Sequence, residues 1–182
     1  MSGITIPTLQ VVRGDIARET SDAIVNAANP ELKGGGGVDG AIHRAAGPEV
    51  LEACRSLGGC EIGDAKATGA GAISARFIIH AVGPIWSRES KAQAAELLAR
   101  CHRRAVEVAD GLEARSISFP AISCGAYRFP PALAAPVALE SAWQAAAQSA
   151  GVRELRFVLL HNGMRDLFAK AACRLGLNVD VK

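Results

Sequence analysis

Amide and carboxylate side chains flank a run of four glycines in the first quarter of the chain. Asn26 lies near the end of an apolar stretch, Asn29 follows that stretch, and Asp39 follows the glycines at 34–37. Each residue alone suits a structural role, because Asn-Pro starts turns and Asp caps helices. Together, two amides and one carboxylate around flexible backbone suit the hydroxyls of a sugar and an activated water molecule. We therefore take these three residues as candidate catalytic groups.

The glycine run allows backbone N–H groups to approach a ligand closely. A glycine inside regular structure costs roughly 0.5–1 kcal/mol relative to alanine, so four in succession need a reason. A helix is expected to begin at about Val38, and N–H groups at the positive end of a helix dipole form an anion site. The segment 122–131 repeats this order of strand, small residues, glycine and helix start. Two such loops predict a site for two phosphates, or for a diphosphate with a sugar beside it.

The same glycines match two common nucleotide motifs only in part. Gly35, Gly37 and Gly40 fit G-x-G-x-x-G, but the residues NPELK separate them from the preceding strand. The acidic residue expected at a strand end about 20 residues further on is also missing. A Walker loop needs Lys followed by Ser or Thr, and no such pair follows. The context therefore argues against both motifs and leaves only the anion site.

Short apolar stretches alternate with helical patterns along the chain. Near-continuous apolar character, which is typical of strands covered on both faces, marks 9–12, 22–28, 76–82, 116–122 and 156–161. Helical periodicity marks 91–110, 130–151 and 163–176. Pro136 should bend or delay the second of these helices. This alternation predicts an α/β domain with three layers, α/β/α.

The unusual segments of the sequence follow predicted strands. They are the stretches 26–40, 82–86 and 120–130. Ligands of α/β sheets bind at the carboxyl ends of strands. We therefore expect the three segments to meet at one ligand site.

Composition places the chain among ordinary globular proteins. It has 182 residues, of which 49% are hydrophobic and 21% charged, and a formal net charge of +2. With no linker or repeat, residues 1–182 are expected to form a single domain. The small charge permits an anionic ligand, whereas nucleic-acid binding is not indicated. The arginines near 100–104 favour a solvated helix face over a basic patch.

Cysteine and histidine usage argues against structural cross-links. Five cysteines without a CxxC pair favour reduced thiols over disulfides or structural zinc, and the four histidines lack the i, i+3 or i+4 spacing of metal ligands. His80 lies inside an apolar stretch, which predicts a satisfied core histidine. The N-terminal segment shows no signal-peptide pattern, and no apolar run is long enough to span a bilayer. We expect a cytoplasmic protein without membrane contact or bound metal.

Six ordered motifs resemble those of the MacroD-type macrodomains. They are GDI (14–16), DAIVNAAN (22–29), GGGGVDGAIHRAAG (34–47), GDAKAT (63–68), IIHAVGP (78–84) and FPAISCGAY (119–127). The resemblance extends over roughly residues 9 to 160. It implies a three-layer α/β/α macrodomain with a central mixed sheet that binds ADP-ribose. Many members of the family hydrolyse the ester between ADP-ribose and an acetyl group or a protein carboxylate.

The resemblance also implies how ADP-ribose would lie. Asp15 would accept a hydrogen bond from the adenine amino group, and the backbone of Ile16 would bind a ring nitrogen. The candidate catalytic residues Asn26, Asn29 and Asp39 would surround the distal ribose. Phosphate-binding amides would come from Gly35, Gly36, Gly37 and Val38 in the first loop and from Ser123, Cys124, Gly125, Ala126 and Tyr127 in the second.

Further residues take roles by the same resemblance, and two positions depart from the family pattern. Tyr127 would pack on the distal ribose, and His43 would be a partner of Asp39, although a surface or core histidine fits it equally well. Arg128 stands where relatives usually have glycine, so it adds a phosphate contact or crowds the mouth of the site. The segment HNGMRDLF lacks the aromatic residue that many relatives stack on adenine, and the candidates to replace it are His161, Asn162 and Phe168.

The expected function is removal of acyl or protein-carboxylate ester groups from ADP-ribose, as an O-acetyl-ADP-ribose deacetylase or a mono-ADP-ribosyl-protein hydrolase. Asp39 or a phosphate of the substrate would activate the water, and no cofactor is needed. Cys124 has no histidine near it in sequence, which argues against a thiol nucleophile. The alternative function is a non-catalytic module that binds ADP-ribose or ADP-ribosylated proteins. The acid and the two amides together argue for catalysis.

Overall fold

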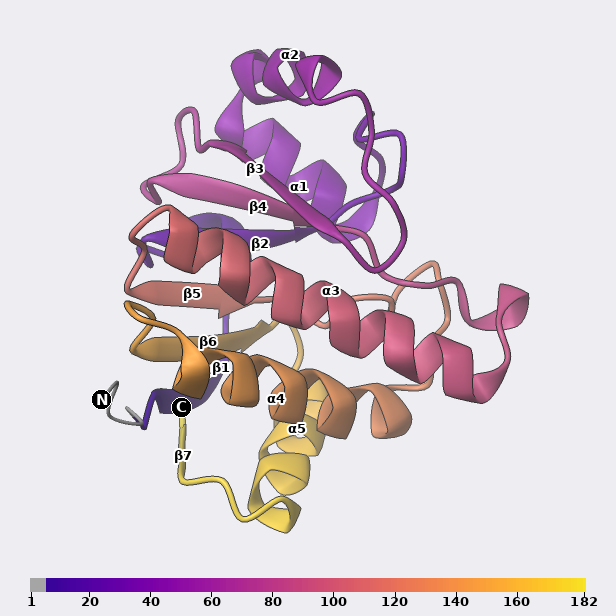
Figure 1. Ribbon diagram of the computed structural model, residues 1–182, viewed down its shortest axis with the longest axis vertical. Coiled ribbons are helices and arrows are strands. Elements are labelled where there is room, and N and C mark those ends of the chain that lie inside the picture. Colours follow the sequence, from indigo (N-terminus) through magenta and orange to yellow (C-terminus); the bar gives the residue numbers. More distant parts are fainter. Residues whose placement is uncertain (1–5) are drawn as a thin grey trace.

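A seven-stranded sheet runs through the protein (Figure 1). The computed structural model describes residues 6–182; residues 1–5, part of the N-terminal segment without a signal-peptide pattern, lie outside it. The strands are β1 (Thr8–Arg13), β2 (Ala23–Ala27), β3 (Ala65–Gly69), β4 (Phe77–Ala81), β5 (Ser116–Phe119), β6 (Glu154–Leu159) and β7 (Val179–Val181). Their order is β3-β4-β2-β5-β6-β1-β7, and only the β3–β4 pair is antiparallel. The sheet is therefore mixed, as the resemblance implies.

Helices cover both faces of this sheet. They are α1 (Gly37–Ala46), α2 (Pro48–Ser56), α3 (Lys91–Gly111), α4 (Pro131–Gln148) and α5 (Asn162–Arg174), with the short 3-10 helices η1 (Ile16–Arg18) and η2 (Trp86–Arg88). Helices α3, α4 and α5 pack on one face, and α1 and α2 on the other (Figure 1). The three-layer α/β/α fold predicted from the alternation of elements is confirmed.

Alternate strand residues enter opposite cores, which explains the continuous apolar stretches. In β2, Val25 packs with α3 and α4 while Ile24 packs with α1 and α2. In β4, Ile79 and Ile78 divide in the same way. Because successive side chains of a strand point to opposite faces, a strand covered on both sides must be apolar at every position.

The observed elements differ from the predicted ones at particular residues. Strand β5 ends at Phe119 rather than 122, because Pro120 has no N–H to donate to a neighbouring strand. The start of helix α4 is not delayed by Pro136, because the helix runs through that residue from 131 to 148. Pro136 lies in the second turn, so only the carbonyl of the exposed Ala132 loses its helical partner. Strands β3 and β7 and helix α2 were not predicted, since they are short or weakly patterned.

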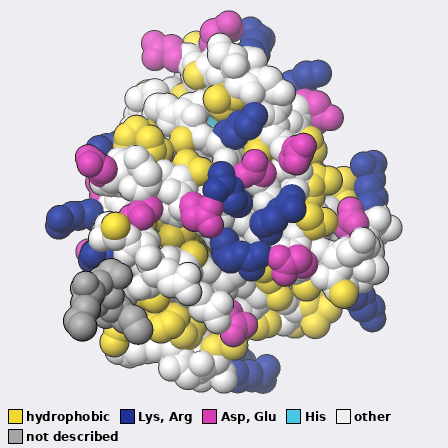
Figure 2. Space-filling model, viewed as in Figure 1, with side chains coloured by type: hydrophobic (Ala, Val, Ile, Leu, Met, Phe, Trp, Pro, Cys, Tyr) yellow, Lys and Arg dark blue, Asp and Glu magenta, His cyan; other side chains and the backbone are white. Residues whose placement is uncertain are grey.

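The outer face of α3 carries charges of both signs. Figure 2 shows Lys and Arg side chains interspersed with Asp and Glu on this face of the molecule. Arg103 lies 2.6 Å from Glu96, and Arg104 lies 2.9 Å from Asp64. These arginines belong to a solvated, ion-paired helix face rather than a basic patch. No helix within residues 6–182 combines the length and the apolar character needed to cross a bilayer.

Candidate functional site

A cavity of about 370 Å³ opens beyond the carboxyl ends of β2, β4 and β5. These strands are neighbours in the sheet, in the order β4-β2-β5, so the segments that follow them meet here. The cavity is lined by Ala27, Ala28, Asn29, Gly35, Gly36, Gly37, Val38, Asp39, Gly83, Ala121, Ile122, Ser123, Gly125, Ala126 and Tyr127. The predicted meeting of segments 26–40, 82–86 and 120–130 is confirmed.

The glycine run forms the N-terminal end of α1 and faces the cavity. Gly36 is the N-cap, and no side chain caps the helix. Gly37 has φ +56°, which glycine adopts without the strain of a side chain. A β-carbon on Gly36 or Gly37 would meet no atom within 4 Å. The first turn of α1 therefore leaves uncapped N–H groups beside the cavity, as an anion site requires.

The second loop closes the opposite side of the cavity. Ser123 adopts φ +64°, and its carbonyl accepts a hydrogen bond from the Phe129 N–H at 2.9 Å. The carbonyl of Tyr127 accepts from the N–H of Trp86 at 3.0 Å, which ties this loop to the segment after β4. A β-carbon on Gly83 would overlap the Ser123 hydroxyl, so glycine is needed where the two segments touch. The Ser123 hydroxyl is buried and has no partner among the described residues.

Among the described residues, Asp39 is the only charged one that lines the cavity. Its Oδ1 accepts a hydrogen bond from Asn26 Nδ2 at 2.7 Å and lies 3.3 Å from His43 Nε2. Its Oδ2 lies beside Gly35 and accepts no hydrogen bond from the described residues. One carboxylate oxygen is therefore held by protein groups while the other is available to a ligand or a water molecule.

Asn26 lies beneath the cavity rather than in its wall. It is fully buried, and its Nδ2 also lies 3.1 Å from His80 Nδ1. Because the amide nitrogen only donates, His80 Nδ1 accepts and the ring proton is on Nε2. That nitrogen lies 2.9 Å from the hydroxyl of Thr68, which in turn donates to the Gly69 carbonyl. A chain of hydrogen bonds thus runs from β3 through β4 and β2 to Asp39.

His80 is a fully buried core histidine, as its position in an apolar strand predicts. Burial and the neighbouring His43 lower its pKa to about 4. The ring therefore stays neutral at physiological pH, which is the state that accepts a hydrogen bond from Asn26. The role of this histidine depends on strand pairing and had no signal in local spacing.

The remaining predicted site residues occupy different places. Asn29 lines the cavity, and its amide donates to the Gly34 carbonyl at 2.8 Å, which holds the start of the glycine run. Tyr127 also lines the cavity; burial, with the charges of Glu31 and Asp39, raises the pKa of its hydroxyl. Cys124 is half-buried and is not among the lining residues.

Asp15 and Ile16 lie after β1, farther along the same edge of the sheet. The Asp15 carboxylate accepts a hydrogen bond from the Ala17 N–H at 3.0 Å and so caps η1, whereas Ile16 is buried. The N–H of Gly14 donates to the carbonyl of Leu159, so Leu160 follows beside this turn and is 63% exposed. Sequence reasoning missed this exposed apolar side chain, because leucine at a strand end has no distinguishing pattern.

One candidate for stacking on adenine is excluded by burial. Phe168 is fully buried in α5, and its ring centroid lies 5.6 Å from that of Phe157. Its helical spacing places it in the core rather than at the site. His161 and Asn162 are exposed at the start of α5, close in sequence to Leu160.

Arg128 adopts a backbone conformation that favours glycine. Its φ is +56°, and its side chain is exposed and outside the cavity lining. This conformation costs an L-residue about 1–2 kcal/mol, a cost that glycine avoids. Glycine, however, loses more conformational freedom on folding, which offsets about 0.5–1 kcal/mol of that gain. We expect Arg128→Gly to stabilise the fold by about 0.5–1 kcal/mol and to raise Tm by about 1–4 °C.

Thermal unfolding of matched variants tests this expectation. Glu113 is also exposed, has φ +57° and lies away from the cavity, so Glu113→Gly should give a similar rise. A fall in Tm for Arg128→Gly beside a rise for Glu113→Gly would show that the arginine side chain makes a stabilising contact.

Comparison with known proteins agrees with this architecture. Residues 25–138 match the family described as Macro domain. A Macro domain-containing protein of Ralstonia nicotianae is 57% identical over 134 residues, 74% of this chain and 78% of that protein. The O-acetyl-ADP-ribose deacetylase of Salmonella typhimurium is 45% identical over 172 residues, 92% and 96% of the two chains. A mutant Oceanobacillus iheyensis macrodomain solved with ADPR has a TM-score of 0.89 and 40% identity, with 95% and 96% covered. The chain belongs to the Macro domain family.

Proposed function

We propose that the protein binds ADP-ribose in this cavity and hydrolyses its esters with acetyl groups or protein carboxylates. The observation that carries the proposal is that Asp39 supplies the one carboxylate among the described residues of a cavity that is lined mostly by glycine, alanine and other uncharged residues. The similarity to a deacetylase of O-acetyl-ADP-ribose and to a macrodomain solved with ADPR supports it.

The geometry suggests one orientation of the ligand. The uncapped start of α1 and the loop 121–127 face each other across the cavity, so the diphosphate is proposed to lie between them. The distal ribose then lies beside Asn29 and Asp39. Adenine extends toward Asp15 and Ile16, where the exposed Leu160 supplies apolar contact in place of an aromatic ring.

The proposed reaction uses Asp39 Oδ2 as a general base. The carboxylate accepts a proton from a water molecule, whose oxygen attacks the acyl carbon of the ester. The bond between that carbon and the ribose oxygen then breaks, and Asp39 passes the proton to the departing ribose oxygen, which leaves as a hydroxyl. Asn26 and His43 hold Oδ1 and so fix the direction of Oδ2. A positioned base of this kind contributes about 10²–10⁴-fold to the rate.

Calorimetric titration with ADP-ribose, combined with hydrolysis of O-acetyl-ADP-ribose and of a mono-ADP-ribosylated protein, tests the proposal. We expect stoichiometric binding of ADP-ribose and turnover of at least one ester. Binding without turnover of either substrate would indicate a module that binds ADP-ribose without hydrolysing its esters. Absence of binding would refute the assignment of the ligand.

Cys124 is not expected to act as a nucleophile. Burial raises the pKa of its thiol to about 11, so the reactive thiolate is scarce near neutral pH. We therefore expect Cys124→Ser to retain turnover within about twofold of the parent protein, a margin small beside the roughly 10²–10⁴-fold contribution of a catalytic group. The measurement is the rate of ester hydrolysis at saturating substrate. A collapse of that rate in a folded variant that still binds ADP-ribose would point to thiol chemistry instead.

A further inference from the structure

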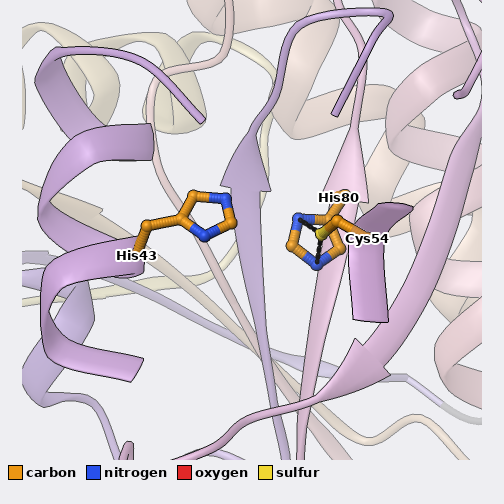
Figure 3. A group of neighbouring side chains, drawn as sticks. All are labelled: His43, Cys54 and His80. Atoms are coloured by element: carbon orange, nitrogen blue, oxygen red, sulfur yellow. Dashed lines mark hydrogen bonds between the residues drawn. The ribbon is translucent and has the colours of Figure 1, made fainter. Parts of the chain in front are cut away.

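A second group of chemically reactive side chains lies beneath the cavity. His43 of α1, Cys54 of α2 and His80 of β4 converge between the helices and the sheet (Figure 3). One ligand atom of each lies within 4.8 Å of the others. Cys54 and His80 are buried, and the His43 side chain is 12% exposed. Because these residues come from three different elements, their spacing in the sequence does not predict the cluster.

The ligand types and spacing suit a borderline divalent cation. Thiolate sulfur and imidazole nitrogen are the ligands that Zn²⁺ prefers in proteins. For three atoms separated by at most 4.8 Å, there is always a point that lies within about 2.8 Å of each of them. Zn–N and Zn–S bonds measure about 2.0–2.3 Å, so each ligand needs to move by less than about 1 Å.

His43 is prepared for coordination by its contact with Asp39. Its Nε2 faces Asp39 Oδ1 at 3.3 Å, which favours a proton on Nε2 and leaves a lone pair on Nδ1. His43 Nδ1 is buried and has no hydrogen-bond partner among the described residues. A histidine that coordinates metal through one nitrogen while its other N–H meets a carboxylate is the usual arrangement in metal sites.

Cys54 completes the group. Its Sγ lies 3.5 Å from His80 Nε2 and 3.9 Å from His80 Nδ1 (Figure 3). Burial and the negative charge of Asp39 raise the pKa of this thiol to about 11, so it is neutral in the metal-free protein. The same negative charge favours a cation, whose binding would release the thiol proton.

We propose that His43, Cys54 and His80 form a site for a divalent cation of the Zn²⁺ type, and that the bound ion weakens ligand binding in the neighbouring cavity. Both nitrogens of His80 already have partners, Asn26 at Nδ1 and Thr68 at Nε2. Coordination by either nitrogen must break one of these contacts. It thereby disturbs the chain of hydrogen bonds that ends at Asp39. This inhibitory site is separate from the proposed hydrolysis, which needs no metal.

Titration of chelator-treated, reduced protein with Co²⁺ tests the site directly. We expect one equivalent to produce a thiolate-to-cobalt charge-transfer band, and Zn²⁺ to displace it. Cys54→Ala should abolish the band. Cys60→Ala is the matched control, because Cys60 is also buried and its pKa is also about 11, but it lies outside the cluster. A band that persists in Cys54→Ala, that disappears equally in Cys60→Ala, or that never forms would overturn the proposal.

A second variant keeps the test decisive if Cys54→Ala does not fold. His80→Asn places an amide oxygen near the position of Nδ1, so it retains an acceptor for Asn26 while removing the imidazole ligand. We expect it to fold and to lose the band; an unchanged band would count against the site.

The inhibitory effect is measured by titration with ADP-ribose in the presence and absence of one equivalent of Zn²⁺. We expect affinity to fall at least tenfold in the parent protein and not in Cys54→Ala. Zn²⁺ binding that leaves ADP-ribose affinity unchanged would refute inhibition. An equal loss in Cys54→Ala would assign the effect to metal bound elsewhere or to the nucleotide itself.

Discussion

Replacing Asp39 with alanine is expected to remove about 10²–10⁴-fold of ester turnover while ADP-ribose remains bound. Within residues 6–182, the carboxylate is the only charged group in the cavity lining, and the diphosphate is proposed to interact with backbone amides instead. Loss of the base therefore affects the chemical step more than affinity. Hydrolysis and calorimetric titration on the same samples separate the two effects.

Asp39→Asn distinguishes a base from a positioning group. An amide fills the same space as the carboxylate and can still contact Asn26 and His43, but it cannot accept a proton from water. If Asp39 is the base, the asparagine variant should be as inactive as the alanine variant. Substantial turnover in Asp39→Asn would limit the carboxylate to positioning. Full turnover in Asp39→Ala would instead favour water activation by a substrate phosphate.

Gly40→Ala is expected to destabilise the fold by about 1–3 kcal/mol and to weaken ADP-ribose binding, because a β-carbon there would overlap the carbonyl oxygen of Gly35. Gly40 lies inside α1, where alanine is otherwise favoured over glycine by about 0.8–1 kcal/mol. The sign of the change in stability therefore shows whether the overlap with Gly35 or the higher helix propensity of alanine is the larger effect. Gly35 must move to relieve the overlap, and it belongs to the cavity lining.

Gly36→Ala is the matched control for stability. Gly36 has φ −96°, which alanine adopts freely, and its β-carbon would meet no atom within 4 Å. We expect its Tm to stay close to that of the parent protein, while Gly40→Ala unfolds about 2–12 °C lower. An increase in Tm for Gly40→Ala would show that helix propensity outweighs the contact with Gly35.

Much of the fold follows from local patterns. Continuous apolar stretches at 22–28 and 76–82 correctly predicted strands buried on both faces, because covering both sides leaves no polar position. The spacing of Asp39 and His43 placed them one helical turn apart, and they are in contact. The ordered motifs, and not the periodicity, predicted the chemical identity of the ligand. Periodicity indicates which residues are buried but not which substrate binds.

Only the tertiary structure decided how these parts meet. The neighbouring positions of β4, β2 and β5 depend on pairing between segments distant in sequence, which no local pattern encodes. That pairing places Asn26 beside His80 and beneath Asp39, while the packing of α2 on the sheet brings Cys54 to His80. The packing of α5 on the other face of the sheet buries Phe168, whose aromatic ring alone suggested a ligand contact. The sequence determined which residues are available for chemistry, whereas long-range strand pairing and the packing of helices on the sheet determined which of them touch.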